Sequence, residues 1–198
     1  MRQTMIKALS LLTVAVLMQG CKIEGEFSTW PCNFAYDNSQ HLDQTLNASL
    51  NPNSTGTFCR IWEDVVRGEK RLYFKNNMGA ESYQPEAAIE KEANYVLGLN
   101  NGIYIGFASG VFDQYGNFAF VAYDVQCPNC VRRTNNTLNP TYAINVDSKG
   151  IGTCRECGNQ YDLNSGGIVI KGAEGDKGME RYRNAFTSGP NGHVSVHR

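Results

Sequence analysis

The sequence predicts an all-β protein in which short strands are separated by tight turns. Ten Tyr and nine Phe, which favour strands, accompany twenty Gly, which favour turns. From residue 57 onward, short apolar runs alternate with clusters of Gly, Asn, Asp and Ser. Hydrophobic residues make up 41% of the chain and charged residues 19%, as in folded soluble domains rather than disordered segments. Its 198 residues correspond to one domain.

Eight apolar runs have the length and composition of strands. They are Phe58–Trp62, Arg71–Phe74, Tyr95–Leu99, Ile103–Ala108, Phe118–Tyr123, Tyr142–Val146, Gly167–Ile170 and Tyr182–Phe186. Asn100-Asn101-Gly102 predicts a hairpin between the third and fourth runs, because these residues tolerate positive φ. Asp113–Asn117 predicts a second turn of this kind. The one predicted helix, Pro85–Asn94, combines three alanines with Glu and Lys.

The N-terminal segment predicts export. Arg2 and Lys7 precede an apolar run over residues 8–18, which is typical of a secretory signal and too short to span a bilayer. Cys21 directly follows Gly20 and resembles the cysteine of a bacterial lipobox, although Met18 and Gln19 depart from that motif. The resemblance implies cleavage after residue 20, a lipid on Cys21 and a cell-envelope location. An ordinary cysteine behind a type I signal is the alternative.

The remaining organisation follows from polarity and from the cysteines. We predict a signal peptide over residues 1–20, a lipidated tether or arm over 21–56, and a β domain over 57–198. The arm is polar and is expected to become ordered where Trp30, Phe34 and Tyr36 reach the core. Cys32 and Cys59 are expected to form a disulfide in an oxidising exported compartment. Lipid is the only predicted membrane contact, since no other apolar stretch approaches about 20 residues.

Two C-x-x-C pairs carry the chemistry. Cys127-Pro-Asn-Cys130 and Cys154-Arg-Glu-Cys157-Gly158 are separated by twenty-three residues, a spacing that can place four thiolates about 2.3 Å from one metal. Gly158 permits the positive φ that such a turn often needs. Three alternatives stay open: two disulfides, four reduced thiols without a metal, and a thioredoxin-type redox pair at the first site. The last requires a helix beginning at Cys127, whereas residues 131–140 are rich in turn formers and end in Pro140.

Residues around the second pair resemble the second box of Rieske [2Fe–2S] domains. In that family the box runs Cys, two residues, His, Gly, two residues, an aromatic, Asp and Gly; Cys154–Gly166 is similar. Three further segments resemble the family: Gly98–Gly106, Phe118–Asp124 ahead of Cys127-Pro128, and Lys171–Ala173 with Tyr182. The resemblance covers about residues 57–187. It implies stacked antiparallel sheets with a small ribbon-like metal-binding subdomain inserted at about residues 124–165.

The metal ligands depart from the Rieske pattern, which uses two Cys and two His. The family's two histidines fall at Asn129 and Cys157, and the chain's only histidines, His41, His193 and His197, lie near neither box. The resemblance therefore carries over Cys127 and Cys154 as ligands, with Cys157 in place of a histidine and Cys130 completing the set. One centre is expected, either Zn or [2Fe–2S]. Export without a twin-arginine signal favours Zn slightly.

No nucleophile–base set, paired carboxylates or phosphate loop is apparent, so no catalytic activity is predicted. The net charge of −1 and interspersed charges exclude a basic surface for nucleic acid. His193 and His197 alternate with Val194 and Val196, which indicates one face of a terminal strand rather than a metal site. Two functions follow. One is an electron-transfer module with an unidentified envelope partner, and the other is a non-redox structural or binding module held by zinc or disulfides.

Overall fold

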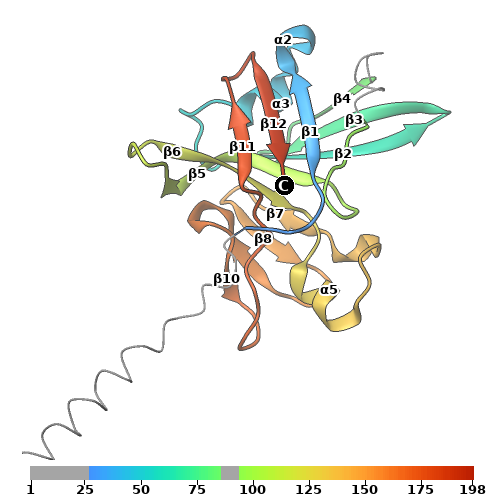
Figure 1. Cartoon of the computed structure of the whole chain (residues 1–198), viewed down its shortest axis with the longest axis vertical. Helices are drawn as coiled ribbons and strands as arrows, with labels where there is room; N and C mark the ends of the chain where they lie inside the picture. The colour runs from blue at the N-terminus through green and yellow to red at the C-terminus, as the bar shows by residue number, and fades with distance from the viewer. Residues whose placement is uncertain (1–26, 86–93) are drawn as a thin grey trace, which may run out of the picture.

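The computed structural model describes residues 27–85 and 94–198, which form three antiparallel sheets with short helices between them (Figure 1). This confirms the predicted all-β class. Within the described residues, no helix is long and apolar enough to cross a membrane. The four-residue helix α2 (Asn38–His41) and the helix α3 (Gln44–Ser49) follow the first strand, and α5 (Pro128–Thr134) follows the sixth.

The largest sheet has five strands in the order β4-β3-β2-β5-β6. Their bounds are β2 Phe58–Val66, β3 Glu69–Asn76, β4 Glu81–Pro85, β5 Ile103–Phe112 and β6 Phe118–Asp124. The three-stranded sheet, in the order β1-β12-β11, consists of β1 Asn33–Asp37, β12 His193–His197 and β11 Asn184–Thr187. The four-stranded sheet, in the order β10-β9-β8-β7, consists of β10 Ile168–Lys171, β9 Gln160–Asp162, β8 Ile151–Cys154 and β7 Ile144–Val146.

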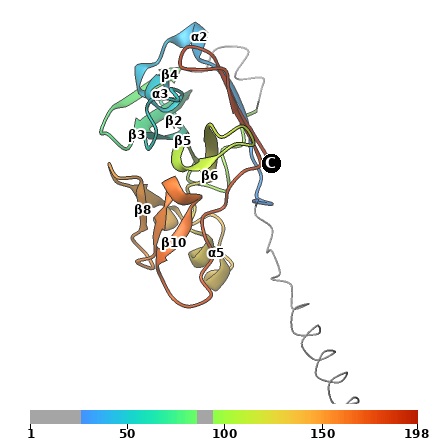
Figure 2. The same cartoon turned by 90° about the vertical axis from the view of Figure 1, so that its left-hand side faces the viewer.

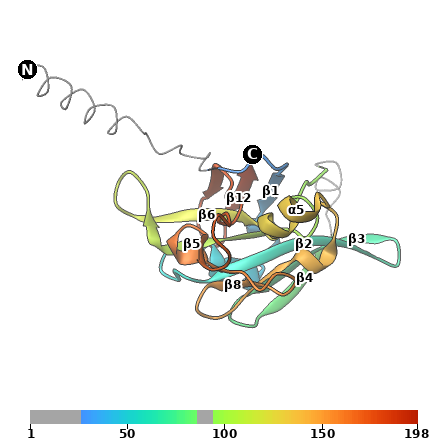
Figure 3. The same ribbon diagram turned by 90° about the horizontal axis from the view of Figure 1, so that it is seen from below.

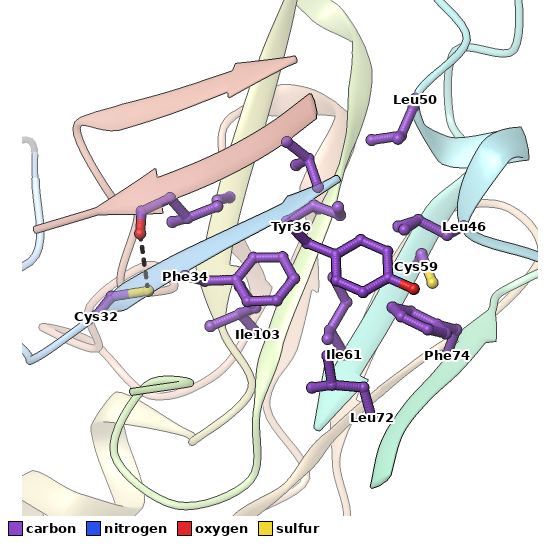
Figure 4. Close-up of a cluster of buried hydrophobic side chains, with 14 of the residues drawn as sticks. Cys32, Phe34, Tyr36, Leu46, Leu50, Cys59, Ile61, Leu72, Phe74 and Ile103 are labelled. Carbon is purple, nitrogen blue, oxygen red and sulfur yellow. Dashed lines mark hydrogen bonds between the residues drawn. The ribbon is translucent and has the colours of Figure 1, made fainter. Parts of the chain in front are cut away.

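A first core lies between the five-stranded and three-stranded sheets. Side chains alternate along β1, so Phe34 and Tyr36 are buried, and they face Ile61, Ile103 and their neighbours (Figure 4). Burying each large apolar side chain stabilises the fold by about 1.5–3 kcal/mol. This core therefore accounts for the close association of the two sheets.

A second core joins the four-stranded sheet to the strands β5 and β6 (Figure 2). Two buried tyrosines of the large sheet reach across it. The Tyr104 hydroxyl donates to the carbonyl of Ile144 over 3.1 Å, and the Tyr123 hydroxyl donates to the carbonyl of Leu163 over 3.0 Å. Because these bonds are buried, they also orient the small sheet. Cys127, Cys130 and Cys154 belong to this second core.

Seven of the eight predicted strands coincide at least partly with observed ones. The prediction of a strand at Tyr95–Leu99 is wrong: only Val96 forms an isolated bridge, with Asn33. Positive φ at Asn94 and Gly98 turns the backbone out of a strand at both ends of this run, so the predicted hairpin lacks its first strand. The predicted turn at Asp113–Asn117 is confirmed. The predicted helix over 85–94 falls on residues 86–93, which lie outside the described residues.

The N-terminal arm is part of the domain from residue 33 onward. Strand β1 pairs along its whole length with β12, and Leu46 and Leu50 of the α3 region are fully buried in the first core. The expected burial of Phe34 and Tyr36 is confirmed. The predicted domain boundary at residue 57 therefore needs correction. The polar composition of the arm concealed an alternating strand of only five residues.

Cys32 and Cys59 are both buried free thiols, so the predicted disulfide is not formed in the structure. Figure 4 shows them at opposite ends of the first core, with Phe34 and Tyr36 between them. Cys32 lies just before β1, 3.7 Å from the carbonyl oxygen of Val196, whereas Cys59 lies within β2. Burial raises the pKa of the Cys32 thiol to about 12. Because the arm enters the core as a strand paired with β12, it does not bring Cys32 to β2.

The carboxyl group of Asp124 ties the end of β6 to the neighbouring segments. It accepts hydrogen bonds from the Tyr182 hydroxyl at 2.7 Å, the Leu99 N–H at 2.9 Å and the Gln126 N–H at 2.7 Å. Burial nevertheless raises the pKa of Asp124 to about 6, because it penalises the charged form. The nearby Glu180 carboxylate acts in the same direction.

We expect this group to make stability depend on pH. A pKa raised above the unfolded value means that the folded state binds the proton more tightly, so stability increases as the pH falls from about 6 to about 4. Relative to Asp124→Asn, the wild type should gain about 2–3 kcal/mol between pH 7 and pH 4 in urea unfolding. Asp113→Asn provides a control of opposite sign, because hydrogen bonds lower the pKa of Asp113. If the free energies of unfolding of the wild type and of Asp124→Asn changed in parallel with pH, the raised pKa of Asp124 would be contradicted.

Candidate metal centre

The structure brings the four predicted cysteines together. The Sγ atoms of Cys127, Cys130, Cys154 and Cys157 all lie within 4.8 Å of one another. The Sγ atoms of Cys127 and Cys157 are 3.7 Å apart, and those of Cys130 and Cys154 are 3.6 Å apart. Three of these residues are buried, and Cys157 is partly exposed. The cluster could hold a metal ion.

The first cysteine pair is positioned by a helix that the sequence analysis did not predict. Cys127 is the N-cap of α5, and Pro128 occupies its first turn, where a missing N–H costs no hydrogen bond. The Cys127 N–H donates to the carbonyl of Tyr142 at 2.9 Å. The backbone N–H of Cys130 acts to lower the pKa of the Cys127 thiol. The helix ends at Asn135, which has positive φ, so Pro140 lies beyond it.

The second pair lies in the turn between β8 and β9. The Cys154 carbonyl accepts from the N–H of Gly158 at 2.9 Å, and the Cys154 N–H donates to the Asn159 carbonyl at 3.0 Å. Gly158 has φ +74°, as the sequence predicts. The backbone N–H groups of Cys157 and Glu156 act to lower the pKa of the Cys154 thiol. N–H groups directed at sulfur favour the thiolate and so lower its pKa, although other contacts raise the pKa of Cys154 overall.

A buried polar group supports Cys127 from the side. The Tyr161 hydroxyl lies 3.1 Å from the Cys127 sulfur and accepts a hydrogen bond from Asn129 Nδ2 at 3.0 Å. Asn129 also donates to the Lys177 carbonyl at 2.8 Å and accepts from the Lys177 N–H at 2.9 Å. Asn129 occupies the position of a histidine ligand in the Rieske resemblance. In this chain, the Asn129 side chain instead hydrogen-bonds the backbone of Lys177 and so holds that segment against the site.

Asp176 connects the two cysteine-bearing segments, and nothing in the sequence pattern identified it. Its side chain is only 2% exposed although it carries a charge. It accepts from Arg133 at 2.7 Å, from Arg132 at 3.3 Å and from Asn159 Nδ2 at 2.8 Å. The two arginines belong to α5, and Asn159 follows the second pair. Both arginines near the site therefore pair with this aspartate.

The thiols are electrostatically unequal. Hydrogen bonds from Cys154 and Tyr161 lower the pKa of Cys127 to about 5 despite its burial. Burial, followed by the charge on Cys127, raises the pKa of Cys130 to about 12. The Cys154 pKa is also raised, first by its hydrogen bond to Cys127. Metal ligands of this type bind as thiolates, so a bound cation would favour ionisation of the four thiols.

The fold and the site define a β protein with a buried four-cysteine cluster. Comparison of the chain with protein-family models, curated proteins and solved structures finds no match. Within residues 27–85 and 94–198, the only group of three or more His, Cys, Asp or Glu side chains placed to hold a metal is these four cysteines. His193 and His197 lie on β12, as expected for a terminal strand.

Proposed function

We propose that the chain is a lipid-anchored bacterial envelope protein whose β domain is held together by one metal ion on Cys127, Cys130, Cys154 and Cys157. The observation that supports the centre is the convergence of four sulfur atoms from two segments 23 residues apart. The observation that supports the anchor is the sequence pattern ending at Cys21. The proposed class is a structural metal module rather than an enzyme.

The sulfur spacing favours a single ion over a two-iron cluster. In a tetrahedral site with metal–sulfur bonds of about 2.3 Å, every pair of sulfurs is about 3.8 Å apart. The distances of 3.7 Å and 3.6 Å match this edge, and no pair exceeds 4.8 Å. A [2Fe–2S] cluster places two bridged irons between its two cysteine pairs and therefore needs a longer separation between the pairs.

Zinc is the ion that we propose. Four thiolates leave no open coordination position, so bound zinc would stabilise the fold without activating water. The surrounding structure needs such support, because the strands of the four-stranded sheet are only three or four residues long. The metal would join α5 to the β8–β9 turn. The Rieske-like order of strands and cysteine pairs is part of this proposal, with the histidine ligands replaced.

One observation favours a second candidate, electron transfer by a single iron. Cys157 is partly exposed, whereas the other three ligands are buried. An exposed ligand gives a short path for an electron to a docked partner. The two candidates predict different metals and different colours.

Metal analysis of the full chain, combined with a count of free thiols, tests the proposal. We expect one zinc per chain, no colour, and four cysteines that react with a thiol reagent only after chelation. One iron with visible charge-transfer absorption and no sulfide would support the electron-transfer candidate. Two irons with labile sulfide would overturn the single-ion centre. Blocked thiols without metal would show disulfides instead.

A substitution at Tyr161 tests whether its hydroxyl group contributes to the metal affinity of the site. Tyr161→Phe removes the hydroxyl that lies 3.1 Å from the Cys127 sulfur but keeps the buried ring. We expect the zinc affinity to fall about 10-fold, because groups that hydrogen-bond to metal ligands typically contribute 10–100-fold. Competition with a chromophoric chelator measures this change. Tyr142→Phe is the matched control, because the Tyr142 hydroxyl contacts Thr134 instead. Equal affinity in both variants would remove Tyr161 from the site.

A further inference from the structure

The turn between β5 and β6 projects from the large sheet (Figures 1 and 3). Its exposed aromatic side chains, Phe112, Tyr115 and Phe118, form what we call the aromatic tip. Phe112, Tyr115 and Phe118 are 57%, 80% and 41% exposed, and the rings of Phe112 and Phe118 lie 5.4 Å apart. Exposed apolar clusters of this kind commonly mark contact surfaces. The only charged residue in the turn, Asp113, accepts hydrogen bonds from the backbone N–H groups of Tyr115 and Asn117. The Asp113 carboxylate is therefore hydrogen-bonded within the turn.

Two arginines contact Phe27, the first described residue of the chain, near the base of this tip. The guanidinium groups of Arg181 and Arg183 each lie 4.7 Å from the centre of the Phe27 ring. Gly166 lies between Arg181 and β5: a Cβ atom added at Gly166 would be 3.9 Å from the Arg181 side chain and 3.8 Å from that of Val111. Val111 directly precedes Phe112. Phe27, two arginines and the aromatic tip thus occupy the same side of the molecule.

The length of chain ahead of Phe27 limits how the domain can face a membrane. Six residues lead from Cys21 to Phe27, and even fully extended they reach only about 20 Å. A compact domain of this size has a radius of gyration of about 15 Å and hence a diameter of about 40 Å. A lipid on Cys21 would therefore keep the side bearing Phe27 nearer to the bilayer than the opposite side.

We infer that the surface formed by Phe27, Phe112, Tyr115, Phe118, Arg181 and Arg183 faces the membrane, with the aromatic tip inserted at the headgroup level of the bilayer. Aromatic side chains prefer this level, and arginines at the same surface attract anionic lipid. The inference rests on the proposed lipid on Cys21 and deepens it, because it gives the domain a defined orientation. It does not depend on the metal.

Two tyrosine-to-tryptophan variants test this orientation. Tyr115→Trp labels the tip. Tyr83→Trp labels β4, which lies at the opposite edge of the same sheet and whose Tyr83 is 52% exposed. Each acylated full-length chain is reconstituted into vesicles of phosphatidylethanolamine and phosphatidylglycerol, with and without brominated acyl chains. The quenching of the parent chain, which contains Trp30 and Trp62, is measured in parallel and subtracted from that of each variant.

We expect brominated lipid to quench about half of the emission added by Tyr115→Trp, because interfacial side chains lie only 5–10 Å deep, and none of that added by Tyr83→Trp. Equal quenching, or no quenching at position 115, would overturn the membrane-facing surface. A blue shift of Tyr115→Trp emission with concentration, in a lipid-free Cys21→Ser chain, would overturn it in favour of a second copy. The mass of the N-terminal peptide distinguishes two reasons for a negative result. If the peptide carries no acyl chains, the proposed lipid anchor is wrong. If it carries them, only the proposed orientation is wrong.

Discussion

Replacing Cys157 by alanine is expected to cost far more stability than replacing Cys32, provided that metal is present. Cys157 is partly exposed, so removing its sulfur leaves little cavity, whereas Cys32 is buried. On packing alone, Cys32→Ala should therefore be the more costly change, at about 1 kcal/mol. With the proposed metal bound, Cys157→Ala becomes the more costly of the two substitutions. Loss of the metal should cost about 4 kcal/mol where free metal exceeds the dissociation constant 1,000-fold.

Thermal unfolding with and without a chelator measures this reversal. For a protein of this size, 4 kcal/mol corresponds to a fall in Tm of roughly 8–16 °C. The chelator should lower the Tm of the wild type and of Cys32→Ala by this amount and should leave Cys157→Ala unchanged. Equal thermal shifts in the two variants, or a chelator effect that persists in Cys157→Ala, would count against a shared site.

Gly102→Ala is the second change for which we expect a large loss. Gly102 has φ +94°, a conformation that costs other residues about 1–2 kcal/mol. In addition, a side chain at Gly102 would overlap the backbone carbonyl oxygen of Ile61 and would lie 2.9 Å from the Cβ of Trp62. Neither contact can be relieved by turning a side chain. The strands β2 and β5 would have to separate where Ile61 faces Ile103.

We expect Gly102→Ala to lower the free energy of unfolding by about 4 kcal/mol or more, which exceeds the usual range for single substitutions. Gly116→Ala is the matched control, because Gly116 has φ +83° and nothing within 4 Å of an added side chain. It should lose only the conformational part, about 1–2 kcal/mol. Urea unfolding of both variants separates strain in the backbone from overlap with β2. Similar losses would show that the close approach is not constrained.

The sequence alone predicted the β class, most of the central strands and the pairing of the two cysteine motifs. These features depend on local patterns: alternating or continuous apolar runs, turn residues such as Gly116, and the C-x-x-C spacing. Strands β1, β4 and β9 escaped prediction because they are short and rich in polar residues, and β8 because it has only four residues, one of them Gly152. The helix α5 was not predicted because the residues after Cys130 are rich in turn formers. The helix nevertheless completes a turn from Pro128 before these residues end it at Asn135.

The tertiary structure decided which cysteines meet. Cys32 and Cys59 were expected to pair because they were the two cysteines left over, yet Phe34 and Tyr36 of β1 lie between them in the first core. The tertiary structure also brings Asp176 to Arg133, 43 residues away, and Lys177 to Asn129, 48 residues away. Local sequence determines strands, turns and ligand types because these depend on neighbouring residues. Contacts between distant segments depend on how whole sheets pack, so only the folded chain reveals them.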